Sequence, residues 1–227
     1  MKSMKATALI ACAGMLFVGC DSKKDAAAAA VQSPAMTMAL VKGDVNQVKA
    51  LLDEGQSVEA MQDSRTPLCV AAMNGHVSVI QLLLARGAQL NYKDQNGQTP
   101  LMYAAGAGKL DAVKALVEQK AEIEATTQMG ETALMGAVGH GYVDVAKFLV
   151  EKGANIQAKM NNGRNVYIMA WERYNGPLPK KDDTALFVWL REKADPKVAK
   201  QMDSAAKASE ALVREVEAKT GGPSKKK

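Results

Sequence analysis

The sequence predicts an all-α solenoid of about five stacked helix–turn–helix repeats, and three observations lead to that fold class. First, Thr66-Pro67-Leu68 recurs 33 residues later as Thr99-Pro100-Leu101, and again as Thr132-Ala133-Leu134. Second, the composition is 48% hydrophobic but only 4% aromatic, which favours helices packed through small residues over a β-sandwich. Third, other positions keep the same interval: Gly75, Gly108 and Gly141, and Ala71, Ala104, Ala137 and Ala170.

The first twenty residues have the organisation of a secretion signal. Lys2 and Lys5 precede an apolar run, Ala6 to Val18, that is shorter than the about 20 residues of a membrane-spanning helix. The following Gly19-Cys20 resembles the bacterial lipobox, although Phe17 stands where that motif usually has leucine. The resemblance implies a signal peptide over 1–19, lipid attachment at Cys20 and a lipoprotein anchored in the cell envelope, facing the periplasm. The alternative is a buried cysteine in an ordinary N-terminal helix.

The residues after Cys20 are expected to be a tether. Asp21 resembles the signal that retains some lipoproteins at the inner membrane. Residues 20–34 have no repeating apolar face and are predicted to be flexible. The formal net charge of +5 equals the charge of the two lysines in 1–19 and the three in 225–227, so the rest of the chain is neutral. A neutral body argues against a dedicated nucleic-acid-binding protein.

The repeating residues resemble ankyrin repeats. The best copy begins with the segment 66–76, TPLCVAAMNGH, and closes with Gly87-Ala88. Thr66 is a favourable N-cap, proline is tolerated at the first helical position, and Gly75 can end the helix in the left-handed conformation. The resemblance implies pairs of helices joined by short β-turn fingers, stacked because one unit cannot cover its own apolar surface.

Five units are expected, over residues 35–60, 61–93, 94–126, 127–159 and 160–197. The first unit lacks the Thr-Pro-Leu triplet, and Ser33-Pro34 is its expected start. In the third unit Lys120 stands where its neighbours have Gly87 and Gly153. The fifth unit is degenerate, with an insertion expected over 175–183 before an apolar helix from Thr184 to Arg191. That insertion is either an exposed loop on a functional side or a feature of an atypical terminal repeat.

The C-terminal segment repeats an apolar face at helical spacing. Residues 198–220 are predicted to form a helix that caps the open end of the stack, and 221–227 to be a disordered basic tail. The tail is solvated or touches anionic lipid. The apolar face of the predicted helix is formed by Val198, Met202, Ala205, Leu212, Val213 and Val216.

The sequence contains no recognisable catalytic or metal-binding motif. Three cysteines cannot form a disulfide framework, and Cys69 is expected to be a small, partly buried thiol without a basic partner. His76 and His140 have no second ligand at metal-binding spacing and are expected to be structural or surface groups. No cofactor, metal or small-molecule substrate is expected, and the protein is predicted not to be an enzyme. The aromatic residues of the last unit form either its core or an anchor for a partner.

The resemblance implies that the protein binds another protein through the concave face of the first helices and through the finger tips. An immunity or inhibitor protein that neutralises a toxin or hydrolase would use the same face, and an enzyme on a solenoid is the third possibility. Candidate contacts on the helices are Met73, Asn74, Gly139, His140, Glu172 and Arg173. Candidate contacts on the fingers are Lys93, Gln95, Asn96, Gln98, Gln128, Met129, Glu131, Asn161, Asn162 and Arg164.

Overall fold

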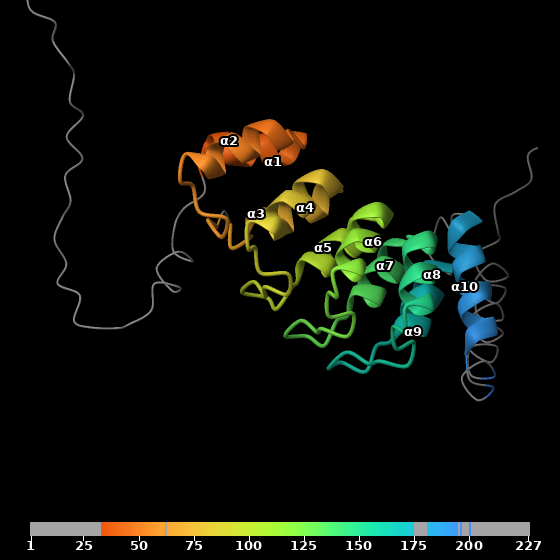
Figure 1. Cartoon of the computed structure of the whole chain (residues 1–227). Helices are drawn as coiled ribbons and strands as arrows, with labels where there is room; N and C mark the ends of the chain where they lie inside the picture. Colours follow the sequence, from red (N-terminus) through yellow and green to blue (C-terminus); the bar gives the residue numbers. More distant parts are fainter. Residues whose placement is uncertain (1–32, 62, 175–180, 195, 197–199, 201–227) are drawn as a thin grey trace, which may run out of the picture.

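A computed structural model describes residues 33–61, 63–174, 181–194, 196 and 200. The expected signal peptide, Cys20, most of the tether, the insertion up to residue 180, and almost all of the C-terminal segment lie outside this part of the chain. In the described residues, the helices follow one another in five pairs (Figure 1). They are α1 (Pro34–Lys42), α2 (Val45–Asp53), α3 (Pro67–Asn74), α4 (Val77–Ala85), α5 (Pro100–Gly106), α6 (Leu110–Glu118), α7 (Ala133–His140), α8 (Val143–Glu151), α9 (Val166–Tyr174) and α10 (Lys181–Lys193).

The first helix of each of the first four pairs begins at a side-chain cap. The hydroxyl groups of Thr66, Thr99 and Thr132 accept hydrogen bonds from backbone amides three residues later, at 3.3–3.4 Å. Ser33 does the same for Met36 at 3.2 Å, which confirms that Ser33-Pro34 begins the first helix of the first unit. These bonds satisfy amides that the helix itself leaves unpaired, so the recurring hydroxyl residue sets the helix start.

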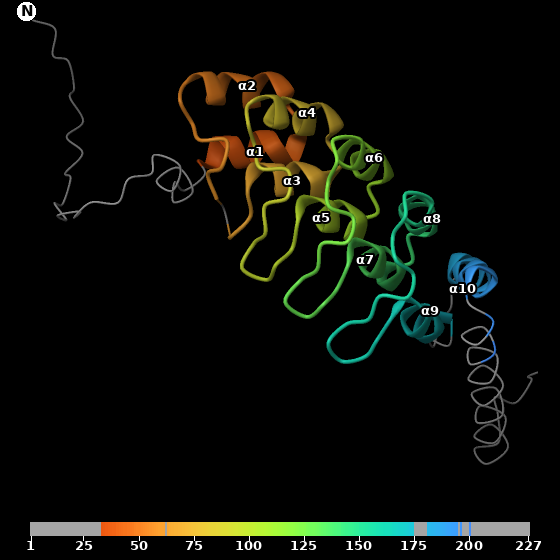
Figure 2. The same ribbon diagram turned by 60° about the horizontal axis from the view of Figure 1, so that its bottom comes forward.

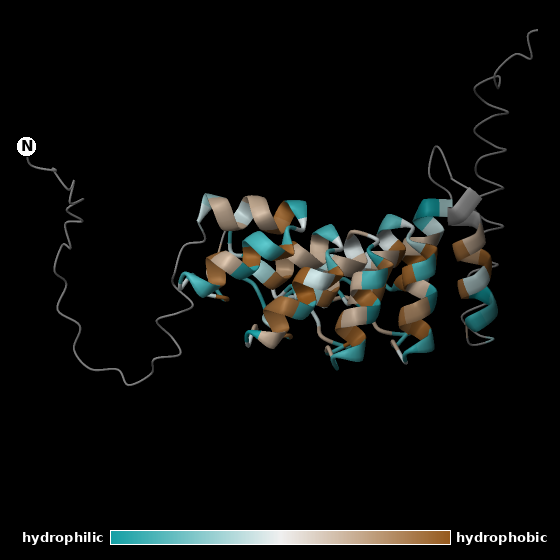
Figure 3. Ribbon diagram, turned by 45° about the horizontal axis from the view of Figure 1, so that its top comes forward, coloured by the Kyte–Doolittle hydropathy of each residue, from teal (hydrophilic) through white to brown (hydrophobic). Residues whose placement is uncertain are grey.

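The helices stack in two rows. In Figure 2 the odd-numbered helices lie next to the projecting loops, and the even-numbered helices lie behind them. Each first helix packs on the first helix of the next pair, in the order α1, α3, α5, α7 and α9. Figure 3 shows hydrophilic and hydrophobic residues alternating along the helices, and each helix contributes buried apolar residues to one core. The predicted all-α solenoid is therefore confirmed.

The core is a chain of leucines that recurs with the repeat. Leu83 is fully buried, as predicted, and Leu116 and Leu149 occupy the corresponding places in the next two units. Leu68, Leu101 and Leu134 are 1% exposed on the first helices. Because each leucine is covered by its neighbouring units, burial is shared along the stack.

The last pair departs from the expected boundaries. Helix α10 begins at Lys181 instead of Thr184, so the prediction that the insertion extends to residue 183 is wrong. In the same unit, Tyr167 and Phe187 are 4% and 6% exposed, which confirms for these two the interpretation as core residues. The ring of Phe187 packs against the rings of Tyr174 and Trp171, with centroids 4.9 and 5.6 Å apart. Aromatic stacking thus joins α9 to α10.

Candidate partner-binding surface

The loops that join one pair to the next project as fingers, and the second, third and fourth of them, at 94–98, 127–131 and 160–164, share one backbone geometry. The amides of Asp94, Thr127 and Met160 donate to the carbonyl oxygens of Gln98, Glu131 and Arg164, at 2.8–3.0 Å. The fourth residue of each turn is a glycine, Gly97, Gly130 or Gly163, with φ of 79–81°. Glycine adopts this left-handed conformation without steric cost, so each finger closes tightly.

Hydrogen bonds between neighbouring fingers tie the tips together. The backbone amide of Gln128 donates to the carbonyl of Asn96 at 3.0 Å, and its side-chain amide donates to the carbonyl of Gln95 at 2.6 Å. Asn161 repeats this pattern one unit later, with bonds to the carbonyls of Met129 and Gln128 at 2.9 and 2.8 Å. Several predicted contact residues therefore also hold the array together. The recurrence of an amide side chain at 95, 128 and 161 was the signal in the sequence.

A buried carboxylate supports the second finger from below. Asp94 is 8% exposed and accepts hydrogen bonds from the amides of Asn96 and Gln98, each at 2.8 Å. The Tyr103 hydroxyl donates to the same carboxylate at 2.6 Å, and the Arg65 guanidinium lies 5.7 Å from the Tyr103 ring centroid. Burial, followed by the bond to Asp94, raises the pKa of Tyr103 well above its usual value. Tyr103 therefore stays protonated and acts as a permanent donor.

The exposed tip of the third finger carries an apolar side chain. Met129 is 69% exposed, the highest value among the large hydrophobic residues that the structure describes. Its backbone amide lies 3.3 Å from the Thr127 hydroxyl, while its side chain projects into water. A shallow groove between the second and third fingers is lined by Asn96, Gln98, Thr127, Gln128, Met129 and Glu131. Five of these six residues are predicted contacts, and the sixth, Thr127, precedes one of them in the sequence.

The predicted contacts on the first helices are less available than those on the fingers. The Asn74 side chain donates to the Val70 carbonyl at 2.8 Å, and Met73 is half-buried. Glu172 is ion-paired with Arg164, and Arg173 donates to the Gly139 carbonyl at 3.0 Å. His140 is exposed, with Nδ1 2.8 Å from the Gly136 carbonyl.

Lys93 lies apart from the finger tips. It is exposed and lines a separate depression with residues 121–126. Asn162 remains at the tip of the last finger, where it is exposed and its side chain accepts a hydrogen bond from the Arg164 amide at 3.0 Å. The structure thus brings the predicted residues at 95–98, 128–131 and 161–164 together on neighbouring tips and leaves Lys93 outside them.

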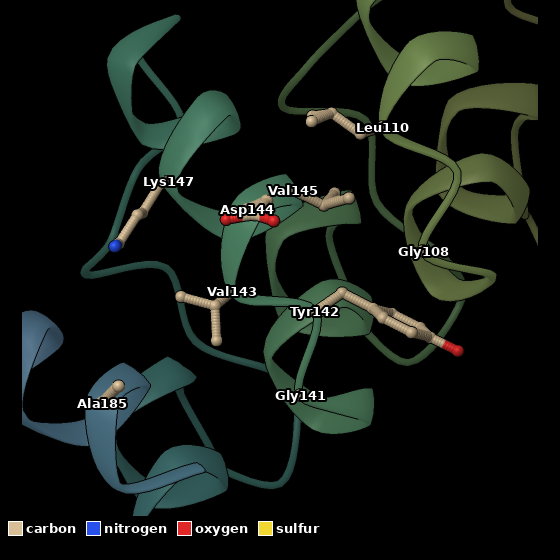
Figure 4. Close-up of a pocket in the computed structure, with 9 residues that line it drawn as sticks. All are labelled: Gly108, Leu110, Gly141, Tyr142, Val143, Asp144, Val145, Lys147 and Ala185. Carbon is tan, nitrogen blue, oxygen red and sulfur yellow. The ribbon is translucent and has the colours of Figure 1, made fainter. Parts of the chain in front are cut away.

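Two kinds of contact between units were not predicted from the sequence. At one edge, the side chains of His76 and Tyr142 lie so close to Gly43 and Gly108 that a Cβ there would come within 2.4 Å of the rings (Figure 4, for Tyr142). His76 also approaches the Val41 carbonyl at 2.9 Å, which confirms its structural role. The other contact is a ladder of side-chain acceptors. Glu59, Asn91 and Glu124 accept from the amides of Gln89, Glu122 and Asn155, at 2.6–3.0 Å.

Cys69 is a buried free thiol. It is fully buried, not partly exposed as expected, and its sulfur lies 3.4 Å from the Thr66 hydroxyl. Burial raises the pKa of Cys69 from 9.0 to about 11, which opposes formation of the reactive thiolate. Within the described part of the chain, no group of three histidine, cysteine or acidic side chains could hold a metal ion.

The pocket in Figure 4 lies on the opposite edge from the fingers. It is lined by Tyr142, Val143, Asp144, Lys147 and Ala185 among others, and it is open to solvent. Its two charged groups, Asp144 and Lys147, belong to the first turns of α8. Over the residues with a described position, no helix combines the length and apolar composition that a bilayer crossing requires.

The architecture defines an all-α repeat solenoid whose fingers form an ordered comb. A family model described as ankyrin repeats, in three copies, matches residues 4–94 and 87–160. These two segments together cover more than half of the 227 residues, and the chain belongs to the ankyrin-repeat family. Proteins built from ankyrin repeats typically mediate protein–protein interaction and generally act as non-enzymatic scaffolds.

Proposed function

We propose that this protein is a membrane-anchored ankyrin-repeat scaffold that binds another protein through its finger tips and the adjoining concave face. The observation that carries the proposal is the position of Met129. Its apolar side chain is 69% exposed at the tip of the third finger, beside a groove whose other lining residues have polar side chains. An apolar anchor surrounded by hydrogen-bonding groups is the arrangement found at the centre of many protein interfaces.

The fold does not require an apolar residue at this place. The corresponding residues of the neighbouring fingers are Asn96 and Asn162, and both form the same turn. Met129 contributes backbone bonds to the comb, through its amide to Thr127 and its carbonyl to Asn161. Its side chain is therefore available to a partner, and replacing it alters the surface without altering the turn.

The bonds between the fingers favour tight binding. Ordering a loop on association costs free energy, and a surface that is already ordered avoids that cost. Four hydrogen bonds link the second, third and fourth fingers at 2.6–3.0 Å. A partner would meet tips whose backbone is already in place, with Met129 and the side chains of Gln98 and Glu131 facing one groove.

The anchoring part of the proposal rests on the N-terminal sequence. Lys2 and Lys5, the apolar run to Val18 and Gly19-Cys20 together resemble a lipoprotein signal. The proposed anchor is a lipid on Cys20 that holds the repeats at the bacterial cell envelope, on the periplasmic side. If the partner is a toxin or hydrolase, the same surface serves an inhibitory function.

Crosslinking in cells followed by mass spectrometry identifies the partner, and one substitution then tests the surface. Met129→Asn installs the residue of the neighbouring fingers, so the melting temperature should stay within about 1–2 °C of wild type, as for surface changes. Affinity for the crosslinked partner should fall at least about fivefold, which corresponds to about 1 kcal/mol. Met38→Asn is the matched control, because Met38 is 55% exposed on α1, away from the fingers.

Wild-type affinity for Met129→Asn would place the binding surface elsewhere. A second variant, Glu131→Ala with Arg164→Ala, tests the charged residues beside the same groove and the next finger. It removes the Arg164–Glu172 ion pair, which is half-exposed and therefore contributes only about 0–1 kcal/mol to stability. We expect the double variant to stay folded and to bind the partner at least about fivefold more weakly.

Metabolic labelling with a clickable fatty acid tests the anchor. The wild-type protein should carry the label and sediment with membranes, whereas Cys20→Ala should do neither. Cys69→Ala is the control, because that thiol is fully buried in the repeats and should not change the labelling. Equal label on wild type and Cys20→Ala would refute the lipid anchor while leaving the protein-binding surface untouched.

A further inference from the structure

The last unit leaves an apolar place uncovered on its first helix. In the second, third and fourth units the residues at this place are Cys69, Met102 and Met135, which are 0%, 7% and 0% exposed. The corresponding residue of α9 is Ile168, which is 40% exposed. Each buried member has a following unit, whereas in the described part of the chain none follows Ile168, so this place faces the next unit along the stack.

The second helix of the last unit shows the same pattern. Its buried residues Leu186, Phe187 and Leu190 correspond in spacing to Val145, Ala146 and Leu149 of α8. Val188 then corresponds to Lys147, which lines the pocket of Figure 4 together with Ala185 of α10.

This helix place therefore also faces the following unit. In the earlier units it is polar, occupied by Gln81, Lys114 and Lys147. In α10 it is a valine that is 44% exposed. A terminal repeat that ended the stack in water would be expected to carry a polar outer face, and this one carries Ile168 and Val188.

We propose that residues 198–220 form an amphipathic helix that packs on this end face, defined by Ile168 and Val188. The segment begins only five residues after α10 ends at Lys193, so its local concentration at the face is high. At 1.5 Å per residue, a helix of this length extends about 35 Å, which is longer than either α9 or α10. Its apolar residues, Val198, Met202, Ala205, Leu212, Val213 and Val216, return on one side of a helix.

The opposite side of the segment is suited to solvent. Asp203 and Lys207, and Glu210 and Arg214, lie on that side and are acid-to-base pairs four residues apart, the order that stabilises a helix. Glu215 and Lys219 form a third such pair nearer the edge of the apolar side. One side of this helix would thus replace the missing sixth unit, and the other would give the stack a polar end. The surface and its occupant are distinct from the fingers, so this inference does not depend on the proposed binding function.

Hydrogen exchange of the full chain tests the contact from the side of the segment. Leu212→Asp with Val216→Asp places two charges on the apolar side and should speed amide exchange in α9 and α10 at least about tenfold. Exchange in α3 to α6 should stay as in wild type. Ala211→Asp with Ala218→Asp adds the same charge on the polar side and serves as the matched control. Unchanged exchange in the first variant, or equal acceleration in both, would overturn the proposal.

The reciprocal variant tests the contact from the side of the repeats. Val188→Lys installs the residue that α6 and α8 carry at this place, so the stack should remain folded. Amides of residues 198–220 should then exchange at the rate of the isolated peptide, whereas in wild type they should be protected. Protection of α9 and α10 that grows with protein concentration would identify a second copy as the occupant and would overturn the proposal.

Discussion

The three middle units and the last unit solve the same packing problem with different contacts. Each middle unit has a threonine cap, and between these units the same contacts repeat: a side chain lying over a glycine, an acceptor ladder and bonds between finger tips. The last unit keeps the bonds between finger tips through Asn161, but Asn165 replaces threonine as the acceptor at the start of α9, with a bond of 3.0 Å from the Ile168 amide. An ion pair between Arg164 and Glu172 joins its finger to α9, and stacked aromatic rings join α9 to α10.

The difference shows which contacts depend on having a neighbour on each side. A middle unit is buried from both directions, so small residues such as Ala104 and Ala137 are enough to fill its interior. Among the described residues the last unit has one neighbouring unit, and stacked rings of Tyr174, Trp171 and Phe187 join its two helices. The regular recurrence of residues is therefore favoured in a unit that packs against a neighbour on each side, and it can be lost in the terminal unit.

The largest expected effect comes from truncating a leucine in the middle of the stack. Leu83→Ala removes a fully buried side chain between units and should cost about 2–5 kcal/mol in the free energy of unfolding. Leu190→Ala, also fully buried, should instead loosen α9 and α10 before the rest of the stack unfolds. Denaturant melts followed by hydrogen exchange distinguish the two. Identical single transitions in both variants would show that the last unit unfolds together with the middle ones.

A second test concerns the side chain that covers a turn glycine. Gly108→Ala combines the left-handed conformation at φ 69° with a Cβ 2.4 Å from the Tyr142 ring, and should cost about 2–4 kcal/mol. Gly153→Ala has φ 94° and open space around it, so it should cost only the conformational part, about 1–2 kcal/mol. In a Tyr142→Ala background the excess cost at Gly108 should disappear. Equal costs at both glycines would remove the proposed close contact.

The burial of the Cys69 thiol should make the stability of the folded protein depend on pH in the alkaline range. The pKa of Cys69 in the folded protein is raised to about 11, so its contribution to stability is complete below its unfolded value of 9.0. That contribution is lost as pH rises through the folded value, because the unfolded chain releases the proton first. Between pH 9 and 11 the stability of wild type should therefore fall more steeply than that of Cys69→Ala. Parallel curves, measured by urea unfolding at each pH, would contradict this burial effect.

The smallest expected effect is a gain in stability. Lys120 has φ of 72° at the end of α6, where the neighbouring units have Gly87 and Gly153. Lys120→Gly relieves this conformation and should stabilise the protein by about 0.5–1 kcal/mol after the entropy cost of glycine. Gly87→Lys is the matched reverse change and should destabilise by a similar amount. A thermal melt in which Lys120→Gly lowers the melting temperature would contradict the strain at this position.

The sequence by itself determined the repeating parts of the fold, because they depend on interactions close in the chain. Thr66 and Thr99 predict helix starts because their hydroxyls reach an amide three residues on, and Gly75 predicts a helix end because it takes a positive φ easily. The period also placed Leu83 in the core, since equivalent apolar residues pack on each other when units stack. These features could be predicted because they depend on residues within one unit or on the recurrence of that unit along the chain.

Only the tertiary structure decided which distant groups meet across units. The bonds from Gln128 and Asn161 to neighbouring fingers and the position of Tyr142 over Gly108 depend on the distance and angle between adjacent units. The start of α10 at Lys181, the ion pair of Glu172 with Arg164 and the bond from Arg173 to the Gly139 carbonyl depend equally on how the last unit packs. A period in the sequence fixes what recurs, but side chains of given length make contact only once the units have stacked at a definite spacing.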